Sequence, residues 1–228
     1  MGQYQNNLLS CSTVNGSMGV RVSPGLLLLI IKTLNFMTKY NKQDSKIKSG
    51  VREFLYMHAL SHLPDDKLLN ILTLPNTNFE LEVRLAHSRR CHVQCCESDV
   101  DVYNRAVVPN GIRLYNTNVF EISGHTFDFV WLDYCNSYSD ITVNNTLSFL
   151  HKNKFADKAL FAVTFMKGRE QRPITYEQFY PNYKLSGFPK HISPFIGNVK
   201  DCRVMQYSCK DLPGRQAPMV LHMFKIQK

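Results

Sequence analysis

The stretch Phe127-Asp128-Phe129-Val130-Trp131-Leu132-Asp133 is the clearest buried strand in the sequence, because it is almost wholly apolar and ends on a carboxylate. From residue 65 onward, similar short apolar runs alternate with amphipathic stretches. This alternation is typical of β-α-β units and predicts a mainly parallel sheet. The further predicted strands are 68–74, 91–97, 112–115 (paired with 119–122) and 158–165, and the predicted helices are 78–90, one beginning near 98, and 140–154.

The segments on either side of this region differ from it in pattern. The chain closes with two strand-like runs, 203–209 and 219–226, and the turn residues between them indicate an antiparallel hairpin. Before residue 65, helical spacing of apolar residues predicts helices at 24–40 and 45–62. We therefore expect a flexible arm at 1–23, a helical extension at 24–64 and one α/β domain at 65–228.

Composition favours a globular protein that does not enter a membrane. The chain has 228 residues, of which 44% are hydrophobic and 20% charged, and this balance fits one domain with a modest extension. Its seven cysteines are odd in number and irregularly spaced, which favours free thiols and a cytoplasmic location. The longest apolar run, 26–31, is too short to cross a bilayer.

Positive charge is concentrated in the last third of the chain. Residues 1–150 hold equal numbers of basic and acidic residues, whereas residues 151–228 hold 14 Lys and Arg against 5 Asp and Glu. A polyanion such as a nucleic acid would be attracted to this end. A solvated basic surface that serves only solubility is the alternative.

The order of elements, five strands separated by helices and then a terminal hairpin, resembles that of class I S-adenosylmethionine-dependent methyltransferases over about residues 67–228. The resemblance implies a Rossmann-like, mainly parallel sheet with helices on both faces and a C-terminal antiparallel hairpin. It also implies that S-adenosylmethionine binds beyond the carboxyl ends of the strands, where strand order reverses. As a small basic protein with a reduced motif, the chain is also similar to methyltransferase-like proteins of large phages and viruses.

The loop after the first strand is the first expected cofactor contact. In the resembling family a glycine-rich turn lies here under the methionine part of the cofactor. This chain has Thr73, Leu74, Pro75 and Asn76 instead, with no glycine before the helix. Asn76 and Asn78 can tolerate a left-handed backbone, and free N–H groups at a helix start can bind a carboxylate. Thr77 and Glu80 are expected to form a capping box at that start.

Two further positions are expected to contact the nucleoside. Glu97 ends the second strand, 23 residues after Leu74, and an acidic residue at this point of a nucleoside site accepts hydrogen bonds from the ribose hydroxyls. A glutamate that only caps the next helix is the alternative. Asn116 follows the third strand, where the resembling family often contacts the adenine ring.

The end of the fourth strand is the expected catalytic position. Asp133 follows an apolar strand, so its carboxylate needs a cleft or a partner. It is the candidate to orient or deprotonate a methyl acceptor, and Tyr134 is the candidate to stack on a ring. Capping or bonding of loop amides is the alternative for Asp133. Cys135 is weighed as a nucleophile and judged a bystander thiol, because its spacing from Asp133 differs from that of the cysteine-dependent enzymes.

The loop after the fifth strand carries the expected substrate contacts, Lys167, Arg169 and Arg172, which could bind phosphate. A mobile charged loop is the alternative. No metal site is expected, since side chains of 91–96 alternate between the two faces of a strand.

The leading hypothesis is a methyltransferase-like protein that uses S-adenosylmethionine and acts on a nucleic acid. The main alternative is a catalytically inactive protein of the same fold that serves as a nucleic-acid-binding or assembly factor, which the glycine-free turn favours. An enzyme that uses another nucleotide ranks below both, because the chain has neither G-x-G-x-x-G nor a P-loop.

Overall fold

The computed structural model describes residues 10–14, 17–21, 46–76, 78–137, 139–166, 192, 194–212 and 215–228. They fall into two compact units, Met1–Lys42 and Gln43–Lys228. In the first unit β1 (Ser10–Val14) pairs antiparallel with β2 (Ser17–Arg21), a hairpin that the sequence did not predict within the expected arm. The helix predicted at 24–40 lies outside the described residues.

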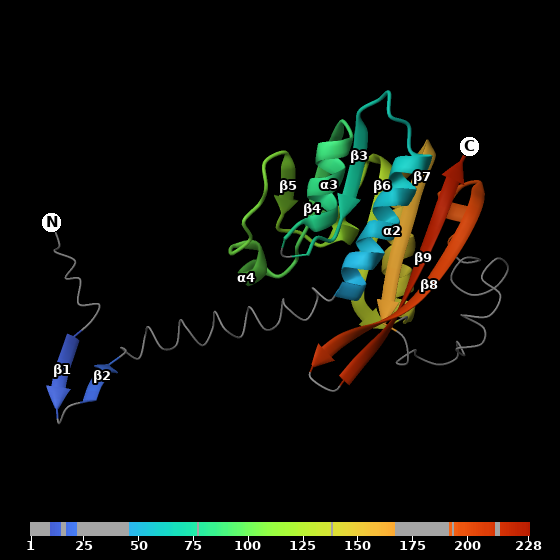
Figure 1. Cartoon of the computed structure of the whole chain (residues 1–228). Coiled ribbons are helices and arrows are strands. Elements are labelled where there is room, and N and C mark those ends of the chain that lie inside the picture. The colour runs from blue at the N-terminus through green and yellow to red at the C-terminus, as the bar shows by residue number, and fades with distance from the viewer. Residues whose placement is uncertain are drawn as a thin grey trace. The chain divides into compact units, whose positions relative to one another are not determined.

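A seven-stranded sheet forms the centre of the second unit (Figure 1). Its order is β5-β4-β3-β6-β7-β9-β8, with β5 to β7 mutually parallel and β9 antiparallel to both of its neighbours. This confirms the predicted Rossmann-like sheet with a terminal hairpin. The strands are β3 (Leu69–Thr73), β4 (Cys91–Cys96), β5 (Ile112–Tyr115), β6 (Thr126–Ser137), β7 (Lys154–Met166), β8 (Val199–Leu212) and β9 (Arg215–Gln227).

The central strands are buried on both faces, which explains their continuous apolar sequences. Along β6, Phe127 and Val130 belong to one core cluster, while Phe129 and Trp131 belong to the other. In β7 every residue from 159 to 165 is buried. These two strands therefore connect the two halves of the hydrophobic core.

Helices cover both faces of the sheet. In Figure 1, α2 (Lys46–His62) and α3 (Glu80–Ser88) lie in front of it. On the opposite face lie α5 (Asp140–Lys152) and the 3-10 helix η1 (Val119–Glu121), while α4 (Val100–Tyr103) follows β4. Within the described ranges, no helix is long and apolar enough to cross a membrane.

Two local predictions are wrong. The segment predicted as a strand at 119–122 forms η1, because the Asn118 side chain accepts a hydrogen bond from Phe120 N and bends the chain into a helical turn. The predicted capping box is also absent, since the N-cap of α3 is Phe79 and it makes no side-chain cap bond. Instead, Asn76 Oδ1 accepts from Glu80 N at 3.0 Å.

Candidate functional site

A cleft of about 330 Å³ opens at the carboxyl ends of β3, β4 and β6. It lies where the order of the parallel strands reverses, between β3 and β6, and at such a point the loops diverge and leave space for a ligand. Four segments that are far apart in the chain, 74–75, 96–98, 117–120 and 133–134, meet there. Its lining consists of Leu74, Pro75, Cys96, Glu97, Ser98, Thr117, Asn118, Val119, Phe120, Asp133 and Tyr134.

Backbone hydrogen bonds fix two of these segments at the end of the sheet. Leu74 N donates to Trp131 O at 3.2 Å, and this bond joins the loop after β3 to β6. Glu97 N donates to Tyr115 O at 3.0 Å, and this bond joins the loop after β4 to β5. The walls of the cleft are thus extensions of the sheet and not independent loops.

Glu97 lines the cleft and also stabilises the following turn. Its side chain is half-buried, and Oε1 accepts a hydrogen bond from Asp99 N at 2.8 Å. The N-cap of α4 is Asp99, whose side chain accepts from the N–H groups of Asp101 and Val102. Helix capping thus falls to Asp99, and Glu97 orients the capping residue from the wall of the cleft.

Asp133 forms a buried ion pair at the floor of the cleft. Its Oδ2 lies 2.8 Å from Lys48 Nζ, and the side chains of Lys48 and Asp133 are only 5% and 11% exposed. The other oxygen, Oδ1, is buried and has no hydrogen-bond partner in the described part of the chain. A buried acceptor of this kind is costly unless a ligand or water donates to it.

Helix α2 supplies polar contacts that the sequence reasoning missed. Besides Lys48, its Ser49 and Arg52 side chains donate to the carboxylate of Glu80 at the start of α3, at 2.9 and 2.7 Å. A signal for Lys48 was present, because it lies at helical spacing from the buried Val51, Leu55 and Ala59. A charged residue on the buried face of a helix indicates a buried partner.

Three of the six expected cofactor residues do not line the cleft, and two of them, Thr73 and Asn76, lie at the end of β3 and in the turn that follows it. Thr73 is buried, and its hydroxyl donates to Glu82 Oε1 at 2.6 Å. Burial raises the pKa of Glu82, and the bond from Thr73 opposes this shift. Asn76 uses its side-chain oxygen to cap α3. Both residues therefore support the turn from beneath, and Leu74 and Pro75 form its surface toward the cleft.

The left-handed residue that this turn requires is Phe79, with φ 51° and ψ 39°. Among the described residues it is the one non-glycine residue with positive φ, and neither Asn76 nor Asn78 has this conformation. The strain of such a backbone is of the order of 1–3 kcal/mol. The Phe79 side chain is only 2% exposed, so burial in the core offsets this cost.

Tyr134 faces the cleft from the hydrophobic core. Its hydroxyl pairs with Thr146 Oγ1 of α5 at 3.1 Å, and burial raises the pKa of the phenol. Its ring lies between Phe120 and Phe165, with centroids 5.8 and 5.6 Å away. The phenol therefore stays protonated and can offer the cleft a ring surface but no base.

On the adenine side, Thr117 and Asn118 reach the cleft while Asn116 is absent from its lining. The expected substrate residues Lys167, Arg169 and Arg172 lie outside the described residues, as does the side chain of Cys135. Cys96 is the thiol in the cleft, and burial raises its pKa to about 12. It is therefore protonated at neutral pH and is no nucleophile.

The cleft combines an apolar wall with two carboxylates and several neutral hydrogen-bonding groups. Pro75, Val119 and Phe120 form the wall, Glu97 provides negative charge, and Asp133 offers the oxygen Oδ1 of a carboxylate whose charge Lys48 balances. This chemistry suits a ligand with a flat apolar ring, hydroxyl donors and a positive charge. No group of three or more His, Cys, Asp or Glu side chains within the described ranges is arranged to hold a metal ion.

No protein-family model and no curated protein matches the sequence. Solved structures are similar in fold. One is a 1,6-didemethyltoxoflavin-N1-methyltransferase from Burkholderia thailandensis with bound S-adenosylhomocysteine, which is 10% identical with 99% of each chain covered and a TM-score of 0.51. Another is a candidate RNA methyltransferase from Pyrococcus horikoshii, 10% identical, with 78% of this chain and 84% of that chain covered and a TM-score of 0.51. These likenesses show the methyltransferase fold and give no support to a phage or viral origin.

Proposed function

We propose that the chain is an S-adenosylmethionine-dependent methyltransferase-like protein and that its methyl acceptor is a nucleic acid. The observation that carries the proposal is the cleft bounded by Pro75, Glu97 and Asp133 at the reversal of strand order. The carboxylate of Glu97 favours a cationic ligand, such as the sulfonium of S-adenosylmethionine, while the charge of Asp133 is balanced by Lys48. The fold shared with the two methyltransferases above supports the same conclusion.

Each wall of the cleft has a separate role in this proposal. Glu97 accepts hydrogen bonds from the ribose hydroxyls, while Thr117 and Asn118 bond the polar edge of the adenine. Pro75 and Phe120 cover the faces of the nucleoside. S-Adenosylmethionine supplies an activated methyl group, and the protein has to align this group with the acceptor.

Asp133 is the proposed orienting residue for the acceptor. Its buried oxygen Oδ1 accepts no hydrogen bond from the described residues. A hydroxyl or amino group of the acceptor can donate a hydrogen bond to this oxygen. When the acceptor lone pair bonds to the methyl carbon, the carbon–sulfur bond breaks and its electron pair stays on sulfur. The acceptor proton then passes to Asp133 or to water. Lys48 is a positioning residue, because it fixes the carboxylate through Oδ2.

The nucleic-acid acceptor rests on charge. The last third of the chain carries 14 basic against 5 acidic residues. The carboxyl end of β7 lies at the same edge of the sheet as the cleft, and Lys167, Arg169 and Arg172 follow β7 in the sequence. We assign these three residues to the phosphates of the acceptor.

Calorimetric titration with S-adenosylhomocysteine tests the proposed cofactor site. We expect Glu97→Gln to weaken binding about tenfold or more, because a hydrogen bond to a charged group contributes about 1.5–3 kcal/mol. Ser98→Trp should weaken it further by filling the cleft, since Ser98 is exposed on its wall. Asp101→Asn, which neutralises an exposed carboxylate of α4 outside the lining, is the control. Absence of binding by the wild-type protein at millimolar ligand would remove the proposal.

A second candidate function is a protein of this fold that has lost the cofactor and only binds nucleic acid. The specific observation in its favour is the turn after β3, which has no glycine and in which Phe79 has a strained left-handed backbone. The side chains of Thr73 and Asn76 bond Glu82 and the backbone of Glu80 there. Nucleic-acid binding that is unchanged by Glu97→Gln and by added S-adenosylhomocysteine would favour it.

A further inference from the structure

One part of the sheet carries polar side chains over three neighbouring strands. A second hollow, of about 190 Å³, lies across β3, β4 and β5. In the strand register Asn70 is opposite His92, and Gln94 is opposite Arg113. Because side chains alternate between faces, these residues share one face of the sheet. We call it the open face and define it by Asn70, His92, Gln94, Arg113, Tyr115 and His125.

Helices cover the other side of these strands. There Val93 and Cys95 of β4 belong to the core cluster that contains Leu81 and Leu85 of α3. On the side of the open face, α5 and η1 pack on β6 and β7 and reach no further than Leu72 and Cys96 in their cluster. Among the described residues, this cluster contains Cys96 of β4 and no residue of β5, and His92, Arg113, Tyr115 and His125 are exposed.

The sequence of β4 already indicates that one face of this strand is exposed. In β4 the polar residues His92 and Gln94 alternate with the buried Val93 and Cys95. Parallel sheets are usually covered on both faces, and their strands are then apolar throughout, as β7 is here. A missing apolar helix would leave aliphatic residues exposed on this face, and none of the six residues of the open face is aliphatic. A polar partner therefore fits this surface.

The charge of the open face is positive. Arg113 is permanently cationic, and neither its side chain nor that of His92 or Gln94 has a hydrogen bond or ion pair with a described residue. No acidic residue lines the hollow. The neighbouring carboxylate of Asp128 is only 4% exposed and is paired with Lys67 at 2.6 Å. A guanidinium with two imidazoles beside it offers hydrogen bonds to phosphate.

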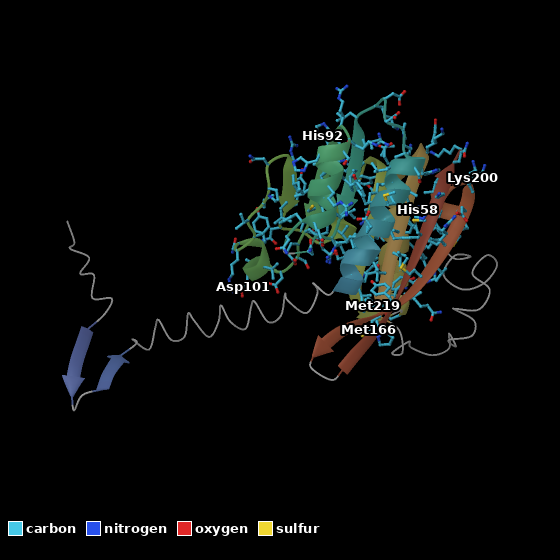
Figure 2. The ribbon with its side chains drawn as sticks, viewed as in Figure 1. His58, His92, Asp101, Met166, Lys200 and Met219 are labelled. Carbon is cyan, nitrogen blue, oxygen red and sulfur yellow. The ribbon has the colours of Figure 1, made fainter. Side chains whose placement is uncertain are left out.

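The open face also leads to the cleft. Figure 2 shows His92 at one end of this part of the sheet and Asp101 of α4 at the other. Tyr115 closes the open face at the carboxyl end, where its carbonyl accepts from Glu97 N and where Thr117 enters the lining of the cleft. Tyr115 is 37% exposed at this junction, which is a position suited to stacking on a base.

We propose that the open face binds a single-stranded segment of nucleic acid and leads it to the cleft, with Arg113 on a phosphate and Tyr115 stacked on a base. The inference rests on the proposed function only for the nature of the acceptor. The open face lies within residues 1–150, which hold equal numbers of basic and acidic residues, and is a surface separate from the basic residues of 151–228.

Fluorescence anisotropy of the full chain with labelled single-stranded oligo(U) and oligo(dT) tests the inference. We expect Arg113→Glu to weaken binding about tenfold and to lower the salt dependence, and Tyr115→Ala to weaken binding by a similar factor. The matched control is Lys158→Glu, which makes the same change of charge at an exposed position of β7. Thermal melts confirm that each variant is folded.

The outcomes separate this inference from the proposed function. Loss of oligonucleotide binding in Arg113→Glu, with unchanged titration of S-adenosylhomocysteine, supports the open face. Binding by the wild type that Arg113→Glu weakens no more than Lys158→Glu overturns it. A wild-type protein that binds neither oligonucleotide also overturns it and leaves a protein partner as the occupant. Failure to bind S-adenosylhomocysteine would remove the cofactor proposal alone.

Discussion

Replacing Lys48 by methionine is expected to lower the free energy of unfolding by about 3–5 kcal/mol, because it leaves the buried carboxylate of Asp133 without its ion-pair partner. Methionine keeps the apolar stem of the side chain, so loss of packing is small. Chemical denaturation at neutral pH measures the change. The large effect follows from burial, since both side chains are almost fully shielded from water.

A solvent-exposed ion pair provides the control for this effect of burial on the free energy of unfolding. Arg203 and Asp201 also form an ion pair, at 3.0 Å, but their side chains are 53% and 34% exposed. Arg203→Met should change the free energy of unfolding by less than about 1 kcal/mol. The double variant Lys48→Met, Asp133→Leu should recover most of the loss, because it removes the unpaired charge. A loss below about 1 kcal/mol in Lys48→Met would show that the pair is not buried in solution.

Acidification is expected to destabilise the protein strongly through His222. This residue of β9 is fully buried against the rings of Phe165 and Phe224, and burial lowers its pKa to about 3. In the unfolded chain a histidine titrates near 6.5. Below pH 6.5 the unfolded state therefore binds a proton at this residue that the folded state does not bind, and the free energy of unfolding decreases as the pH is lowered. Between pH 7 and pH 4.5 the loss from this one residue is about 2–3 kcal/mol.

The variant His222→Leu isolates this contribution. Its own stability at pH 7 can differ from that of the wild type, but its loss on acidification should be smaller by about 2–3 kcal/mol. Glu82 has a pKa that burial raises, so it acts in the opposite direction, and it is present in both proteins. Parallel pH profiles of wild type and variant would contradict a buried neutral His222.

The strands could be predicted because burial in the sheet requires apolar residues at positions that lie close together in the sequence. A continuous apolar run, as around Phe129 and Leu160, indicates a strand that is buried on both faces. The alternation of polar and apolar residues in β4 indicates a strand that is buried on one face. The same local character explains why Glu97 and Asp133 were found, since each carboxylate directly ends such a run. The resemblance in strand order then placed them at one edge of the sheet, where the structure brings both to the cleft.

The contacts that shape the site could not be predicted in the same way. Lys48 and Asp133 are separated by 85 positions, and no local period relates them. At the turn after β3, Asn76 was expected to contact a ligand, but the first turn of α3 has free N–H groups and the side chain of Asn76 bonds one of them. Asn118 likewise caps η1, where a strand was expected. In both turns an asparagine side chain bonds a backbone N–H group, and the apolar pattern of the sequence does not reveal such a bond.

A crystal structure of the full chain soaked with millimolar S-adenosylhomocysteine would show whether the cleft at the carboxyl ends of β3, β4 and β6 binds the cofactor. We expect the nucleoside in the cleft, with its ribose hydroxyls within hydrogen-bonding distance of Glu97 and its base between Pro75 and Phe120. A cleft that stays without ligand, or a ligand bound elsewhere on the sheet, would contradict this expectation.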